Sequence, residues 1–214
     1  MDLIQALAAE LGKDPRHVEN VVRLLDEGNT IPFIARYRKE LHGAMDDTSL
    51  RTLEERLQYL RGLEERREAV KKSIDEQGKL TDELAAAIDS AKTLAEVEDL
   101  YRPYKQKRRT RATMAKEKGL EPLAALLFAQ ERDCPRPEEA ARDFVDPEQG
   151  VETVEDALQG ASDIIAEQIS DDAAIRKSLR ALISRQGQLV SRAATEDDSV
   201  YRLYYDFTQS VARL

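Results

Sequence analysis

Apolar residues recur at intervals of three and four positions along most of the chain, which predicts amphipathic helices. The first such stretch runs from Leu3 to Leu11, and Gly12 is expected to end it. A second begins with Asp14 as the N-cap and Pro15 at the first helical position. Two short helices joined by so tight a turn resemble a helix-turn-helix unit, although plain helical bundles use the same geometry.

Two further helices are predicted before residue 80. Residues 30–41 are expected to bury three side chains on one face: Phe33, Ile34 and Tyr37. The longest helix covers Asp46 to Gln77 and would span on the order of 45 Å. Its apolar stripe consists of Leu50, Leu53, Leu57, Leu60, Leu63, Val70 and Ile74. Gly62 lowers the helix propensity by about 1 kcal/mol relative to alanine, and we expect it to permit close packing.

Threonines stand where three later helices are expected to begin: Thr81, Thr93 and Thr153. Gly119 precedes a short apolar helix over residues 121–130, and Gly187 ends a helix that begins at Asp171. Residues 188–195 are predicted to be extended. The aromatic residues near the end of the sequence are Tyr201, Tyr204, Tyr205 and Phe207. They indicate either a packing surface for further chain or ordinary core burial.

Composition agrees with this helical pattern. Of the 214 residues 41% are hydrophobic, 35% charged and 5% aromatic, which favours exposed helices over a β-sandwich or barrel. Cys134 is the single cysteine, so no internal disulfide can form and a reducing cytoplasm is expected. No apolar run approaches the roughly 20 residues that span a bilayer. We therefore predict a cytoplasmic, all-α multi-helix bundle with a helix-turn-helix-like N-terminal part and one long central helix.

We predict three parts: helix-turn-helix-like helices over residues 1–45, the long helix and a basic segment over 46–120, and an acidic helical part over 121–214. Charge is distributed unevenly over them. The chain carries a net charge of −9, but residues 101–118, the basic segment, hold eight cations and one acid. These cations are Arg102, Lys105, Lys107, Arg108, Arg109, Arg111, Lys116 and Lys118. By contrast, residues 138–172, the acidic segment, hold twelve acids against one arginine.

The basic segment has two interpretations. A cluster of like charges indicates a polyanion or an acidic surface as its partner. The plainer interpretation is a solvated loop whose arginines pair with carboxylates of the same chain. Tyr101 and Tyr104, on either side of Pro103, offer ring faces that can stack on bases or pack as a stiff turn.

Residues with catalytic chemistry are sparse. The sequence has no phosphate-binding glycine loop of the GxxxxGK[ST] or GxGxxG type. His17 and His42 have no second ligand at metal-binding spacing and are expected to be surface or capping residues. Cys134 lacks a neighbouring histidine that would make it a nucleophile. Three pairs of adjacent acids are better explained by helix capping than by a divalent cation: Asp46-Asp47, Asp171-Asp172 and Asp197-Asp198. We predict no catalytic site, no metal, no cofactor and no enzymatic activity for this chain by itself.

Several ordered stretches resemble one known family. LYRPYKQKRRTRATMAKEKGLEPLA, residues 100–124, resembles a signature of the Tex family of bacterial transcription accessory proteins. So do NTIPFIARYRK at 29–39, LRTLEERLQYLRGL at 50–63 and DEQGKL at 75–80. In that family an N-terminal helical region precedes a ribonuclease-H-like domain, a helix-hairpin-helix segment and a C-terminal S1 RNA-binding domain. The resemblance implies that this chain is the N-terminal region and stops near the start of the ribonuclease-H-like domain.

The resemblance also implies a transcription accessory module that associates with RNA or DNA. We expect phosphate contacts of low sequence specificity from nine residues: Arg36, Arg38, Lys39, Arg102, Lys105, Lys107, Arg108, Arg109 and Arg111. In this family the S1 domain is the expected principal binder. The alternative is a protein-interaction scaffold that positions the other domains of a longer chain or docks on the transcription machinery, with the basic segment facing the acidic one. A hydrolase is the weakest interpretation, because it depends on the ribonuclease-H-like domain.

Overall fold

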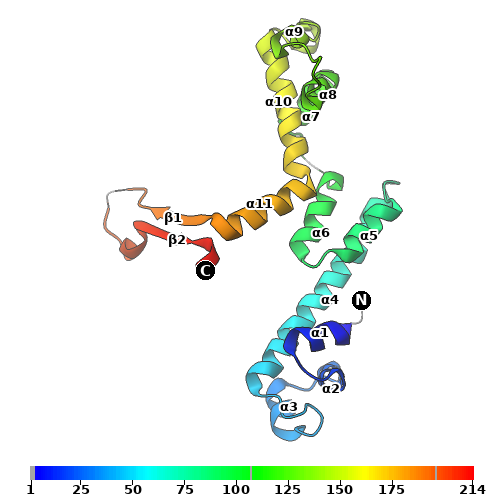
Figure 1. The fold of residues 1–214 in the computed structure, drawn as a ribbon, viewed down its shortest axis with the longest axis vertical. Coiled ribbons are helices and arrows are strands. Elements are labelled where there is room, and N and C mark those ends of the chain that lie inside the picture. Colours follow the sequence, from blue (N-terminus) through cyan, green and yellow to red (C-terminus); the bar gives the residue numbers. More distant parts are fainter. Residues whose placement is uncertain (1–2, 107, 196) are drawn as a thin grey trace. The chain divides into compact units, whose positions relative to one another are not determined.

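The computed structural model describes residues 3–106, 108–195 and 197–214. These residues form eleven α-helices, four short 3-10 helices and a single two-stranded sheet (Figure 1). The prediction of an all-α, multi-helix fold is therefore confirmed. The chain divides into two compact units, Met1–Val97 and Glu98–Leu214, and this boundary falls inside the middle one of the three predicted parts.

The first unit is built on one long helix. It contains α1 (Leu3–Leu11), α2 (Pro15–Asp26), α3 (Ile31–Tyr37), α4 (Asp47–Asp75), α5 (Asp82–Ser90) and the start of α6 (Leu94–Tyr101). Helices α1, α2 and α3 pack against α4, and the first half of its apolar stripe joins their core (Figure 1). The predicted caps form, since Asp14 accepts a hydrogen bond from the amide of Arg16 at 2.9 Å and Asp46 from that of Ser49 at 2.7 Å.

Three expectations about the first unit are wrong. The buried residues of α3 are Ile31 and Ile34, one turn apart, and this turns Tyr37 outward with 57% of its surface exposed. His42 is a buried residue, only 1% exposed, in the turn between α3 and α4. Gly62 does not serve close packing, because a Cβ atom built there would meet nothing within 4 Å.

The second unit has its own core around α10. Its elements are η1 (Arg102–Tyr104), α7 (Arg111–Glu117), α8 (Glu121–Ala129), α9 (Pro137–Arg142), η2 (Pro147–Gln149), α10 (Val154–Asp171), α11 (Ala173–Gln186), β1 (Gln188–Arg192), η3 (Arg202–Tyr204), β2 (Asp206–Ser210) and η4 (Val211–Arg213). Helices α7, α8 and α9 pack against α10 (Figure 1). Leu120, Leu123 and Ile164 are completely or almost completely buried between them.

Part of the basic segment is helical, although the plainer interpretation had it as a loop. Thr110 caps α7 by accepting a hydrogen bond from the amide of Thr113 at 3.0 Å. Ala112 and Ala115 are buried in the core with α10. The small apolar residues between the cations therefore give this stretch a buried face, which stabilises it as a helix.

The extended stretch predicted at residues 188–195 is β1, which pairs with β2 in antiparallel register, Gln188 opposite Ser210. Tyr201 and Tyr204 are 67% and 54% exposed, so these two rings are not core residues. Among the described residues, every helix is too short or too polar to cross a bilayer.

Candidate nucleic-acid interface

The basic segment follows the end of α6 and continues through η1 into α7. Arg102 lies in η1, Arg108 precedes α7, and Arg111 is the first residue of α7. Lys107, also a predicted phosphate contact, lies outside the described residues. The predicted cations therefore share one short stretch of the second unit, and their partners decide how much charge they present.

Two of these cations contact acids of α10. The Nε atom of Arg102 donates a hydrogen bond to Oδ1 of Asp171 at 2.8 Å. The Nε atom of Arg111 lies 3.6 Å from Oδ1 of Asp163. Both acids belong to the acidic segment, so part of the positive charge is offset within the unit. This is the arrangement expected from the plainer interpretation of the basic segment.

Two more cations pair with acids close to them in sequence. Arg109 donates from Nη2 to Oε2 of Glu117 at 2.6 Å, and Lys105 pairs with Glu98. The Arg109 side chain is still 69% exposed. Arg108 is exposed and makes no ion pair with any other residue that the structure describes. The outward side of the segment therefore keeps uncompensated charge at Arg108.

A groove of about 490 Å³ lies between the basic segment and α10. Its charged lining residues are three cations and three acids: Arg102, Lys105, Arg111, Asp163, Glu167 and Asp171. A phosphate inside this groove would face carboxylates as closely as guanidinium groups, which costs electrostatic free energy. The groove is therefore a poorer phosphate site than the outer surface around Arg108.

The other predicted cations belong to the first unit, at the end of α3. Arg36 and Lys39 are exposed and Arg38 is half-buried. None of the three forms an ion pair with a carboxylate of the described residues. The guanidinium of Arg38 lies 5.4 Å from the centroid of the Phe33 ring. This cluster has fewer cations than the basic segment, but none of them is paired with a carboxylate of the described residues.

A buried acid in the second unit was not predicted from the sequence. Asp99 is 5% exposed and accepts a hydrogen bond from Nε of Arg176 at 2.6 Å and another from Arg180. These bonds connect α6 with α11. The one sequence signal was the four-residue spacing of the two arginines, which places them on the same helix face.

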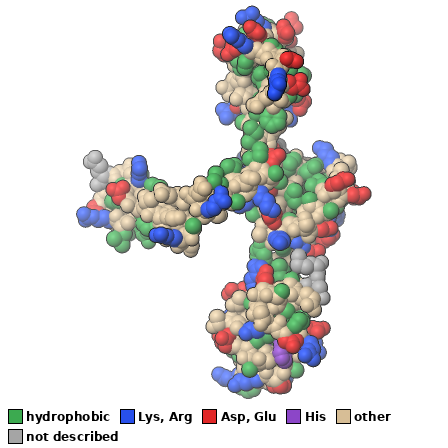
Figure 2. Space-filling model, viewed as in Figure 1, with side chains coloured by type: hydrophobic (Ala, Val, Ile, Leu, Met, Phe, Trp, Pro, Cys, Tyr) green, Lys and Arg blue, Asp and Glu red, His purple; other side chains and the backbone are tan. Residues whose placement is uncertain are grey.

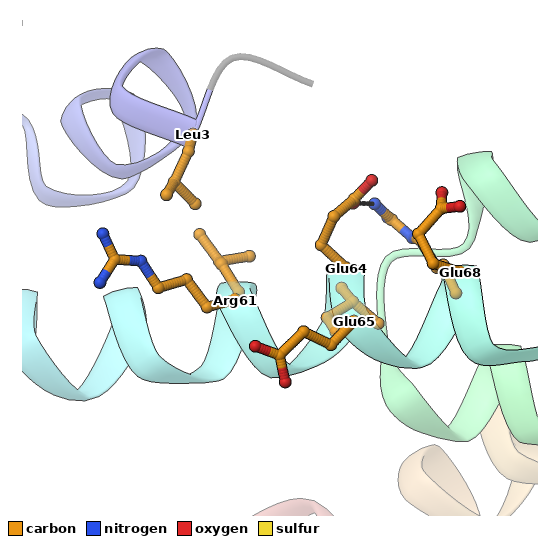
Figure 3. A pocket seen from close by; sticks show the side chains of 8 residues that line it. Leu3, Arg61, Glu64, Glu65 and Glu68 are labelled. Atoms are coloured by element: carbon orange, nitrogen blue, oxygen red, sulfur yellow. Dashed lines mark hydrogen bonds and ion pairs between the residues drawn. The ribbon is translucent and has the colours of Figure 1, made fainter.

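An apolar groove of about 610 Å³ runs along α4 in the first unit (Figure 3). Three leucines line it, Leu3, Leu60 and Leu63, together with five charged residues: Arg61, Glu64, Glu65, Arg67 and Glu68 (Figure 3). Within this lining, Arg67 donates a hydrogen bond from Nη1 to Oε2 of Glu64 at 2.6 Å.

Arg61 beside this groove makes a two-bond pair with Asp26, at 2.7 and 2.9 Å. This guanidinium lowers the pKa of the Asp26 carboxyl below its usual value of 3.8. Within the described ranges, no three histidine, cysteine or acidic side chains are grouped to hold a metal ion. On the face shown in Figure 2, acidic and basic side chains are interspersed in both units.

Comparison with known proteins finds relatives over nearly the whole chain. The chain is 50% identical over 203 residues to protein YhgF of Escherichia coli, covering 94% of this chain and 26% of the relative. It is 42% identical over 208 residues to the transcriptional accessory protein Tex of Neisseria gonorrhoeae, covering 97% of this chain and 27% of the relative. The human S1 RNA-binding domain-containing protein 1 is 32% identical over 173 residues, which cover 80% of this chain and 17% of that protein.

The chain thus spans roughly a quarter of the length of its bacterial relatives. Family models match two parts of it. Residues 1–75 match the Tex-like protein N-terminal domain, and residues 133–214 match the model described as Tex central region-like. Together these matches cover more than half of the chain, and the chain belongs to the Tex family of transcription accessory proteins.

Proposed function

We propose that this chain is a helical module of a Tex-like transcription accessory protein and that it contacts the phosphate backbone of RNA or DNA. The name of the Neisseria relative supports the accessory role in transcription. The name of the human relative, which mentions an S1 RNA-binding domain, supports association with RNA. The contact residues in this chain are Arg108, Arg109 and Arg111.

The observation that carries the proposal is the exposure of these three arginines. The side chains of Arg109 and Arg111 are 69% and 80% exposed although each lies near an acid. Exposed ion pairs contribute about 0–1 kcal/mol, so a phosphate can replace the carboxylate at small cost. Arginine also donates two parallel hydrogen bonds to a phosphate, which strengthens the exchanged contact.

The test is fluorescence anisotropy with single-stranded RNA, single-stranded DNA and duplex DNA over a salt series. We expect similar affinities for different base sequences and a steep loss of affinity with salt. An Arg108→Glu/Arg109→Glu variant should bind more weakly because two phosphate contacts are lost. The salt slope should become smaller by about 1.4 with single strands and by about 1.8 with duplex DNA.

The matched control is Arg132→Glu/Arg136→Glu, which makes the same change in net charge at two exposed positions of the same unit. Circular dichroism should show that both variants keep their helices. Equal losses in the two variants would mean that only net charge matters and would contradict the assignment to Arg108 and Arg109. An absence of binding to all three nucleic acids at low salt would contradict the proposal for this chain.

The second candidate is a scaffold for other domains or for proteins of the transcription machinery. Two ion pairs favour it: Arg102 pairs with Asp171, and Arg176 pairs with Asp99. In both pairs the arginine connects elements of the same unit and is not free for a phosphate. A scaffold of this kind would bind a protein partner in a pull-down with the basic-segment variant as well as with the wild type.

A further inference from the structure

Two aromatic residues lie on one side of α3, of which Tyr37 is exposed and Phe33 is half-buried. Phe33 and Tyr37 are one turn apart, with ring centroids 5.3 Å from each other and planes tilted by 47°. Tyr37 is 57% exposed, and the helix is anchored by Ile31 and Ile34 instead. A large ring that adds so little to the core is available to an outside partner.

The cations around these rings are also available. Arg36 lies with its guanidinium 6.0 Å from the centroid of the Tyr37 ring, and Arg38 lies 5.4 Å from that of Phe33. Over residues 36–40, three cations stand against Glu40 alone. With no carboxylate partner among the described residues, these cations present a net positive surface beside an exposed ring.

Stabilisation of the helix explains the charge but not the ring. Cations at the C-terminal end of a helix interact favourably with its dipole, by about 0.3–1 kcal/mol each. That effect accounts for arginine and lysine at the end of α3. It gives no reason for Tyr37 to remain in solvent, and an aliphatic or polar residue would serve the helix as well.

The element that carries the rings is held firmly. The carbonyl oxygen of Leu41, in the turn after α3, accepts a hydrogen bond from His17 Nδ1 at 3.0 Å and another from Asn20 Nδ2 at 3.2 Å. Both donors come from α2. Because the backbone is fixed on both sides of Tyr37, a ligand that meets this surface loses little free energy to ordering the chain.

From these observations we infer that Tyr37 is a stacking site for an unpaired base of single-stranded RNA or DNA, with Arg36, Arg38 and Lys39 on the neighbouring phosphates. The inference rests on the proposed association with nucleic acid and adds a second contact, in the first unit, with a preference for single strands. Bases in a duplex are already stacked on each other, whereas a single strand can turn a base onto an exposed ring.

The absence of tryptophan from the sequence provides a direct test. A Tyr37→Trp variant carries a single tryptophan at the proposed site, and a base that stacks on the indole quenches its fluorescence. We expect strong quenching by a single-stranded oligonucleotide and weak quenching by a duplex of equal length. A Phe128→Trp variant is the matched control, because its position is exposed and its neighbours in α8, α10 and α11 include no cation.

A second measurement compares affinities. Tyr37→Ala should weaken binding of the single strand by between about 5-fold and 150-fold, as removal of a base-stacking ring does, while binding of the duplex stays nearly unchanged. Equal losses for single strand and duplex, or equal quenching of the two tryptophan variants, would overturn the inference.

The two proposals fail in different ways. If Arg108→Glu/Arg109→Glu weakens binding but the Tyr37→Trp fluorescence does not respond to any oligonucleotide, the contact in the second unit stands and the stacking site is refuted. If the Tyr37→Trp fluorescence is quenched both with and without the Arg108→Glu/Arg109→Glu change, the stacking site is supported and does not depend on the basic segment. An unchanged anisotropy with every oligonucleotide at low salt would refute both.

Discussion

Two neighbouring residues in the turn after α3 hold left-handed backbone conformations. Gly43 has a φ of +59° and Ala44 a φ of +58°. A left-handed conformation costs an L-residue with a Cβ atom roughly 1–2 kcal/mol, so Ala44 is strained and Gly43 is not. A Cβ atom on Gly43 would also overlap the ring of His17.

This contrast predicts opposite effects of two small substitutions. Gly43→Ala should lower the free energy of unfolding by about 1–3 kcal/mol, because it adds backbone strain and displaces His17. Ala44→Gly should leave it unchanged or raise it by up to about 1 kcal/mol. Urea denaturation followed by circular dichroism measures both, and a destabilised Ala44→Gly variant would contradict the account of strain in this turn.

The burial of individual side chains was the hardest feature to predict from the sequence. Tyr37 matched the apolar spacing of its helix, yet it lies in solvent because α3 is only seven residues long and its two isoleucines take the contacts with the core. His42 carried no sequence signal of burial. It lies in the turn after α3, next to Leu41, whose carbonyl accepts hydrogen bonds from His17 and Asn20 of α2.

At the scale of elements, two glycines inside helices have different surroundings. A Cβ atom on Gly62 of α4 would meet open space, whereas one on Gly160 of α10 would overlap Leu120 and lie 3.3 Å from the Cβ of Ala115. Gly160 therefore allows α10 to approach α7 and the start of α8, and Gly62 allows nothing comparable.

Replacing each glycine with alanine should separate helix propensity from packing. Gly62→Ala should raise the free energy of unfolding by about 1 kcal/mol, since alanine is the better helix former and no contact changes. Gly160→Ala gains the same propensity but must displace Leu120, and we expect a net loss of up to about 2 kcal/mol. Thermal unfolding measures both, and similar shifts in the two variants would contradict this reading of α10.

Two exposed ion pairs connect the short helices of the first unit to α4. Arg56 binds Glu10 of α1 through two bonds of 2.8 Å, and Arg61 binds Asp26 of α2. In each pair the hydrogen bond with the arginine is the largest cause that lowers the carboxyl pKa. An acid whose pKa is lower in the folded state than in the unfolded state stabilises the fold, and this stabilisation is complete at any pH above the unfolded pKa. This stabilisation is lost as the pH falls through the lower, folded value.

We therefore predict that a Glu10→Gln/Asp26→Asn variant is less stable than the wild type at pH 7 and that the difference shrinks below about pH 4. Because the side chains are half-exposed and screened by solvent, each pair should contribute no more than about 1 kcal/mol. Urea midpoints from pH 7 to pH 3 give the comparison. A difference that stays constant over this range would exclude ionisation as its cause.

At the scale of the whole chain, the division into two units has a consequence for unfolding. Each unit encloses its own cluster of buried apolar residues, one around α4 and one around α10. Asp99, in the part of α6 that belongs to the second unit, accepts hydrogen bonds from Arg176 and Arg180 of α11. A change at Asp99 should therefore destabilise the second unit and leave the first largely unaffected.

The Tyr37→Trp and Phe128→Trp variants can report on the two units separately. Asp99→Ala should lower the urea midpoint seen by Phe128→Trp, by an amount equivalent to about 1.5–3 kcal/mol, because it removes charged hydrogen bonds from a buried site. Asp198→Ala, which removes an exposed acid paired with Arg202, should change it by less than about 0.5 kcal/mol. An equal shift in both reporters would mean that the chain unfolds as one cooperative unit.

The sequence by itself determined the helical class, the order of the helices and most of their ends. These features depend on the local pattern of apolar residues and on caps such as Asp14 and Thr153, which contact residues only two or three positions away. The sequence also identified the family, because long stretches of the chain match the models of the Tex family.

The tertiary structure alone decided which charges are free. Arg102 and Asp171 are 69 positions apart, and Asp99 and Arg176 are 77 apart, so no local pattern indicates that they pair. The same long-range packing exposes Tyr37 and leaves the cations near it without carboxylate partners among the described residues. Local charge shows where cations are concentrated, but their availability to a ligand depends on the carboxylates that folding brings beside them.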